Sequence, residues 1–213
     1  DGTARPVETP GDWEFRRRHI LSHLQRVMGP QPATDPAIAL EMKVTARERL
    51  PKYERRSISF VAEPGDRVPG YLLVPHENVS VPGGSGRRPA VLCLHQTTKA
   101  GKDEPAGISG SENLHYAAGL AERGYVTLAV DYPNFGTYTF DAYAAGYDSA
   151  TMKGIINHRR AVDLLASRPQ VDAARIGVIG HSLGAHNSLF LAAFDRRVRA
   201  VVSCCGFNSF RHY

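Results

Sequence analysis

The 213 residues are enough for one substantial core, and 42% hydrophobic with 22% charged residues is the composition of an ordinary soluble globular domain. The formal net charge is +5, but the basic residues are scattered in short groups, which argues against a nucleic-acid-binding protein. No apolar run approaches the roughly 18 residues of a membrane span, and three cysteines are too few for a disulfide framework. We therefore expect a soluble protein that binds neither nucleic acid nor membrane, and the compartment, cytoplasmic or exported, stays open.

Residues 1–55 are interpreted as a helical extension followed by a connector. Apolar residues between positions 11 and 29 recur near helical spacing, with Asp12 as the expected N-cap and Gly29 as the stop. A proline-rich stretch, PQPATDPA, follows as the connector. We expect this helix to pack on the main domain, and partner binding is the less favoured alternative.

From residue 56 to residue 213 the pattern is that of an α/β domain. An antiparallel hairpin is predicted first, with a turn around Pro64–Asp66. Continuous apolar runs follow, separated by helical patterns at Leu114–Ala121 and Ile155–Ala166; the runs are 90–95, 125–130, 175–180 and 198–204. Strands that are apolar on both faces are typical of a covered parallel sheet, so Cys93 and Cys204 are expected to be buried. The prediction is a doubly wound, mostly parallel sheet with right-handed crossovers.

The pentapeptide GHSLG, Gly180–Gly184, lies where a predicted parallel strand passes into a helix. This context favours a tight turn that presents Ser182 as a nucleophile over an ordinary strand–helix turn. Gly180 and Gly184 are needed because a Cβ at either position would strike the neighbouring strand or helix, and His181 completes the turn. The helix that begins at Ser182 favours negative charge at its N-terminus.

Two backbone N–H groups are expected to form an oxyanion hole beside this serine. One belongs to Leu183, the residue after the serine, and the other comes from the loop that follows strand 90–95. Thr97 is favoured by position, with Gln96 as the alternative. His95, at the end of the strand, is expected to connect loops rather than to titrate.

These segments resemble the dienelactone-hydrolase-like and acetyl-xylan-esterase-like branch of the α/β-hydrolase superfamily over most of residues 56–210. The resemblance is carried by LCLHQTTKAGKDEPAG, LAERGYVTLAVDYPNFG, TMKGIINHRRAVDLL and RIGVIGHSLGAHNSLF. It implies the α/β-hydrolase fold and ester or related acyl hydrolysis by a Ser–His–Asp triad, without metal or organic cofactor. Dienelactone hydrolase itself uses a cysteine, so Ser182 favours a carboxylesterase. HQT in place of HGGG argues against the esterase group that carries the glycine-rich motif.

The acid and the base of a triad are not evident in this chain. In this fold they follow the nucleophile in the order acid, then histidine. After Ser182 the candidates are Asp195, His186 and His212. Asp195 lies about 15 Å along the helix from the serine, toward the wrong end of the sheet. His186 lies one turn into the same helix and is expected to pack against the sheet or a neighbouring loop. His212 could reach the rim of the site, but nothing orients it as a base.

The segment after the last predicted strand is short. Residues 205–213 are too few for a parallel crossover, which needs about a dozen residues or more. We therefore expect the core to lack its C-terminal strands here, with the acid, the histidine and about two strands beyond Tyr213 or on another chain. Pairing with such a C-terminal fragment, or a homo-oligomer, is the expected assembly.

An aromatic-rich segment follows strand 125–130 and is a candidate wall of the substrate pocket, because loops at the carboxyl ends of strands line such sites. Tyr132 and Phe135 are the favoured lining residues, and the alternative is that these rings only fix the loop. Asp131 is expected to anchor the loop. The segment 102–104, Lys102 to Glu104, is expected to be solvated, with contact to a polar substrate as the alternative.

Together these features predict a serine hydrolase that cleaves small-molecule carboxylic esters through an acyl-enzyme. An acyl-peptide or thioester hydrolase with the same turn is the first alternative. A non-catalytic binding module on the same fold is the second.

Overall fold

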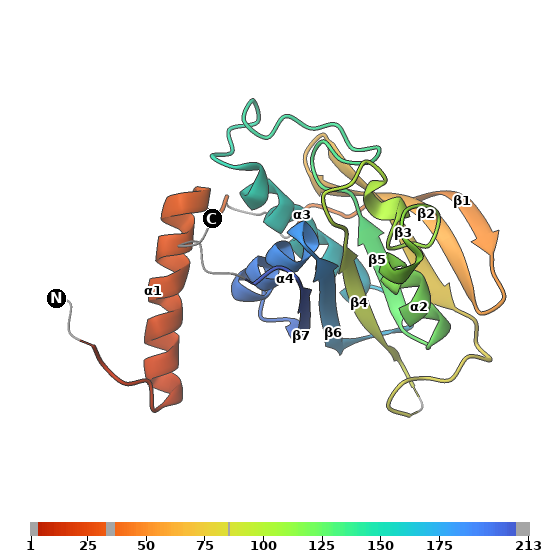
Figure 1. Cartoon of the computed structure of the whole chain (residues 1–213), viewed down its shortest axis with the longest axis horizontal. Coiled ribbons are helices and arrows are strands. Elements are labelled where there is room, and N and C mark those ends of the chain that lie inside the picture. Colours follow the sequence, from red (N-terminus) through yellow and green to blue (C-terminus); the bar gives the residue numbers. More distant parts are fainter. Residues whose placement is uncertain (1–3, 33–36, 85, 208–213) are drawn as a thin grey trace.

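The computed structural model describes residues 4–32, 37–84 and 86–207. Within these ranges the strands form one sheet in the order β1-β2-β3-β5-β4-β6-β7 (Figure 1). The strands are β1 (Lys43–Arg49), β2 (Tyr53–Glu63), β3 (Asp66–Pro75), β4 (Arg88–Leu94), β5 (Val126–Val130), β6 (Val171–His181) and β7 (Val198–Cys204). The α-helices are α1 (Pro10–Met28), α2 (Tyr116–Glu122), α3 (Ala150–Ala166) and α4 (Leu183–Phe194), and short 3-10 helices span Gly101–Asp103 and Glu112–Leu114.

The predicted α/β fold is confirmed. Strands β2 and β3 form the antiparallel hairpin, and β3 pairs antiparallel with β5. Strands β5, β4, β6 and β7 are parallel neighbours. Each predicted apolar run coincides with one of these four parallel strands, and both predicted helical patterns coincide with helices.

Alternate side chains of the central strands pack into two separate cores. Leu92 of β4 belongs to the core that also contains Val162 of α3 and Leu191 of α4. Cys93, the next residue, belongs to the core that contains Ala117 of α2. The sheet is therefore covered by α2 on one face and by α3 and α4 on the other, which explains why its strands are apolar on both faces.

Helix α1 begins one turn earlier than the sequence indicated. Thr9 is the N-cap, and Asp12 is the third helical residue of a reciprocal capping box with it, so the expectation of Asp12 as the cap was wrong. The helix ends at Gly29, as predicted, where the φ angle is 90°. It stands beyond α4 in Figure 1. Its apolar contacts with the domain are made near its C-terminal end, where Met28 is buried in a core with Met152 of α3, whereas Phe15 is 67% exposed. Among the described helices, none has the length and apolarity that crossing a bilayer would require.

Two elements at the edges of the sheet differ from expectation. Strand β1 lies inside the segment interpreted as connector, so the sheet begins before residue 56. Its sequence, KVTARER, has no apolar periodicity because this edge strand is largely exposed. Cys204 is exposed and not buried, because β7 is the other edge of the described sheet and pairs on one side with β6.

The order of the parallel strands creates a crevice at their carboxyl ends. The chain passes from β4 through α2 to β5, and then through α3 to β6 on the other side of β4. The connections after β4 and β6 therefore leave toward opposite faces of the sheet. Such a switch point is where open α/β sheets bind their ligands. The segment 131–149 arches over this same edge, at the top of Figure 1.

Candidate functional site

The turn between β6 and α4 lies at this switch point. Ser182 occupies it with φ 51° and ψ −114°, a left-handed backbone conformation that a residue with a side chain rarely adopts. Its N–H donates to the carbonyl of Cys204 over 2.9 Å, which fixes the turn to the end of β7. Leu183 is the first residue of α4, so its N–H has no acceptor within the helix.

The two glycines of the turn lie where the backbones come closest. A Cβ at Gly180 would lie 2.2 Å from the carbonyl carbon of Gly184. A Cβ at Gly184 would lie 2.0 Å from the carbonyl oxygen of Leu94 in β4. Both obstacles are backbone atoms that cannot move cheaply, so the close approach of the helix to the strands requires glycine at both positions.

His95 is buried below the loop that follows β4 and fixes the first peptide of that loop. Its Nδ1 lies 2.6 Å from the carbonyl oxygen of Gln96, and its Nε2 lies 3.4 Å from the N–H of Tyr132. A carbonyl only accepts, so Nδ1 carries the proton and Nε2 accepts. Burial lowers the pKa of His95, although its bond to Gln96 acts in the opposite sense, so the ring is neutral.

This contact determines where the next N–H points. The carbonyl of Gln96 and the N–H of Thr97 belong to the same trans peptide, in which the two groups point in opposite directions. Because the carbonyl faces the buried His95, the N–H of Thr97 points away from that ring. That orientation is compatible with the predicted role of Thr97 as an oxyanion donor, which stays a prediction.

A buried ion pair anchors the same loop. The Nζ of Lys102 donates to Asp131 over 2.7 Å and to the Thr137 hydroxyl over 2.8 Å. Asp131 also accepts from the backbone N–H groups of Lys102 and Thr137. Lys102 is 5% exposed and Glu104 is 3% exposed, so the expectation of a solvated 102–104 loop was wrong for both. The sequence showed their charge but not their partners, which are Asp131 for Lys102 and Gln96 for Glu104.

A pocket of about 380 Å³ opens between the loops after β4 and β5. Its lining residues are Thr97, Thr98, Lys99, Asn134, Phe135 and Gly136. Phe135 thus lies where a substrate wall was predicted. Tyr132 is 4% exposed and packs edge-on against His95, beneath this surface. Within the described ranges, no three His, Cys, Asp or Glu side chains gather closely enough to hold a metal ion.

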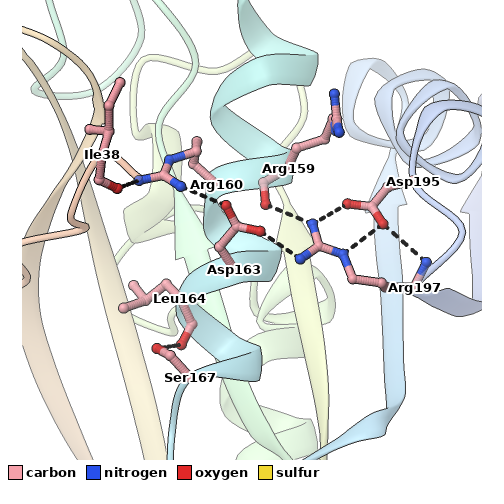
Figure 2. Close-up of polar contacts among 8 residues, drawn as sticks. All are labelled: Ile38, Arg159, Arg160, Asp163, Leu164, Ser167, Asp195 and Arg197. Atoms are coloured by element: carbon pink, nitrogen blue, oxygen red, sulfur yellow. Dashed lines mark hydrogen bonds and ion pairs between the residues drawn. The ribbon is translucent and has the colours of Figure 1, made fainter. Parts of the chain in front are cut away.

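Asp195 lies at the far end of α4 from Ser182 and is paired there. Figure 2 shows its carboxylate facing Arg197, whose Nε and Nη2 donate over 2.9 and 2.6 Å. Arg197 also donates to Asp163 of α3 and to the carbonyl of Arg159. This network joins α3 to the residue before β7. It holds the Asp195 carboxylate at the end of α4 that lies away from Ser182.

His186, one turn into α4, stacks on Phe190 with ring centroids 6.2 Å apart, which directs its ring along the helix. His212 lies outside the described residues, so its predicted position at the rim is not tested.

Asp195 gives a prediction for acid stability. Burial alone would raise its pKa, but the hydrogen bonds from Arg197 outweigh this effect and the pKa lies below the usual value. A depressed carboxylate pKa stabilises the fold above the unfolded-state value near 3.9 and loses that contribution as pH falls through the folded pKa. We expect Asp195→Asn to lower the free energy of unfolding by about 2 kcal/mol at pH 7 and by much less at pH 3.

Thermal or urea unfolding at the two pH values measures this difference. Asp172→Asn is the matched control, because it breaks an ion pair with Arg175 that lies on the surface, and it should change stability little at either pH. An equal loss at pH 7 and pH 3 for Asp195→Asn would contradict the assignment.

Comparison with known proteins agrees with this architecture. Residues 158–212 match the family described as BAAT / Acyl-CoA thioester hydrolase C terminal. The chain is 36% identical to the Fusarium hydrolase LUC6 in an alignment 158 residues long that covers 71% of this chain and 33% of LUC6. A glucuronoyl esterase from Solibacter usitatus superimposes with a TM-score of 0.66 at 19% identity, over 93% of this chain and 60% of that one.

An acetyl xylan esterase from Paenibacillus sp. R4 superimposes with a TM-score of 0.60 at 18% identity, with the same coverage of 93% and 60%. At these identities the structures establish the fold. The chain spans about a third of the length of LUC6.

Proposed function

Because the chain belongs to the α/β-hydrolase superfamily, in its dienelactone-hydrolase-like esterase branch, we propose that it hydrolyses carboxylic esters through an acyl-enzyme on Ser182. The observation that carries this proposal is the backbone of the β6–α4 turn. It holds a serine at φ 51° between two glycines that no larger residue could replace, at the N-terminus of a helix. A strained conformation persists where surrounding structure imposes it, and such sites are concentrated at catalytic centres.

The proposed reaction has two steps. In the first, the Ser182 oxygen attacks the acyl carbon, its proton passes to a base, and the alcohol leaves with that proton. The oxyanion formed in the attack accepts hydrogen bonds from the N–H groups of Leu183 and Thr97. Each such donor is worth about 2.7–4 kcal/mol in known cases. In the second step water attacks the acyl-enzyme and releases the carboxylic acid.

The base and its orienting acid are proposed to come after Ser182 in the intact protein, as the order of triad residues in this fold implies. The described candidates are engaged elsewhere. Asp195 pairs with Arg197 at the far end of α4, and the ring of His186 stacks on Phe190.

A thioester hydrolase is the second candidate. It is favoured by one observation, the match of residues 158–212 to a family described by acyl-CoA thioester hydrolysis. The chemistry at the serine is the same, and only the leaving group differs.

The test is hydrolysis of p-nitrophenyl acetate and butyrate by the intact protein, beside acyl-CoA thioesters of the same acyl groups. We expect ester turnover with an initial burst of p-nitrophenol that equals the amount of enzyme. Faster turnover of the thioesters at equal acyl length would support the second candidate. A folded intact protein that cleaves neither class would contradict both and support a binding module.

A further inference from the structure

Three side chains link the loop after β4 to the turn that bears Ser182. The Nε2 of Gln96 donates to the carboxylate of Glu104 over 3.0 Å. The Oε1 of Gln96 lies 2.9 Å from the Nδ1 of His181, the residue directly before Ser182. We call Glu104, Gln96 and His181 the Gln96 bridge.

The direction of these hydrogen bonds follows from their chemistry. A carboxylate only accepts, so the amide nitrogen of Gln96 faces Glu104 and the amide oxygen faces His181. His181 must then donate from Nδ1. The second oxygen of Glu104 accepts from the backbone N–H of Ser111 over 3.3 Å, so the carboxylate has a fixed position at the start of the bridge.

The burial of Glu104 removes a carboxylate from water, which is unfavourable unless other contacts offset it. Only 3% of this residue is exposed, and a carboxylate out of water destabilises the fold unless it is hydrogen-bonded. A loop residue that served only solubility would lie at the surface. Its main side-chain partner is an amide that continues directly to the residue beside the proposed nucleophile.

The bridge fixes Gln96 from two sides. Its carbonyl accepts from His95, and its side chain is held between Glu104 and His181. The peptide between Gln96 and Thr97 is thus fixed relative to the Ser182 turn. The proposed oxyanion hole needs this relation, since one N–H comes from the loop and the other from the turn.

We infer that the Gln96 bridge positions the Thr97 N–H relative to Ser182, which makes Gln96 and Glu104 positioning residues for ester hydrolysis. This inference rests on the proposed function. Its kinetic signature is specific: donors preset for the oxyanion act on the transition state, so their displacement lowers kcat and leaves KM nearly unchanged. A purely structural role would lower thermal stability without this split.

The test compares five variants of the intact protein on p-nitrophenyl acetate. Gln96→Met keeps the length of the side chain but neither hydrogen bond, and we expect kcat to fall by up to about 100-fold. Glu104→Met should give a similar loss, and the double variant should be no worse than either, because the bridge acts as one unit. Glu104→Gln retains an acceptor oxygen for Gln96 and should recover most of the parent kcat. Glu112→Gln, which removes an exposed carboxylate of the same segment, is the control and should match the parent.

The outcomes separate the two levels of the proposal. A parent protein that hydrolyses no ester overturns the proposed function and this inference with it. An active parent whose kcat is unaffected by Gln96→Met overturns the inference alone, as does a variant in which only KM or only the melting temperature changes.

Discussion

Replacing Ser182 by alanine in the intact protein is expected to lower kcat for ester hydrolysis by about a million-fold, the size of loss seen when a serine hydrolase loses its nucleophile. The reason is chemical, because alanine offers no oxygen to be acylated. The backbone at φ 51° is as unfavourable for alanine as for serine, so the variant should keep the fold and the melting temperature of the parent. Steady-state kinetics together with thermal unfolding measure both expectations.

Ser167→Ala is the matched control for this substitution. Ser167 is the C-cap residue of α3, where its hydroxyl donates to the carbonyl of Leu164 (Figure 2). Its loss should leave kcat unchanged. Substantial residual turnover by a folded Ser182→Ala protein would contradict the assignment of the nucleophile.

Replacing Asp131 by alanine is expected to destabilise the protein by about 3–5 kcal/mol, because it leaves the ammonium of Lys102 buried without its partner. Asp131 is fully buried and Lys102 is 5% exposed, so water cannot replace the lost contact. The backbone N–H groups of Lys102 and Thr137 lose their acceptor as well. Urea unfolding measures the change, and the loop that carries Thr97 should lose its fixed position at the same time.

Two further variants test whether the unpaired ammonium of Lys102 causes the loss of stability. Asp103→Asn alters a neighbouring carboxylate that lies 3.9 Å from the same ammonium and is partly exposed, so it should cost less than about 1 kcal/mol. Lys102→Met combined with Asp131→Asn removes the buried charge and keeps an acceptor for the backbone, and it should be more stable than Asp131→Ala. If the double variant were the less stable of the two, the unpaired ammonium would not be the cause.

The central sheet could be predicted because its signals are local. Apolar runs such as 90–95 and 125–130 became β4 and β5, since burial on both faces needs no information beyond the run itself. The edge strands were harder to predict. Strand β1 is charged along its length, and Cys204 looked buried until the sheet order placed β7 at an edge. The apolar run of β7 does not indicate that this strand lies at an edge of the described sheet, because that position depends on the order of the strands.

Those parts of the candidate site that depend on local sequence could be predicted, and those that depend on contacts between separate segments could not. The glycine spacing identified the Ser182 turn, because a close backbone approach restricts residue type directly. The expectation that Asp131 anchors its loop agrees with its contacts to Lys102 and Thr137. The Gln96 bridge could not be predicted, because Gln96, Glu104 and His181 meet only after the loop folds onto the turn. Polar residues in the loop were visible, but burial depends on partners that are distant in sequence.

The central claim is that the hydroxyl oxygen of Ser182 becomes acylated, and covalent labelling tests this claim most directly. The intact, folded protein would be treated with a fluorophosphonate, followed by intact-mass measurement and peptide mapping. The account predicts one phosphonyl group per chain, located on Ser182, and none in Ser182→Ala. A folded, ester-hydrolysing protein that carries no label, or carries it on another residue, would contradict it.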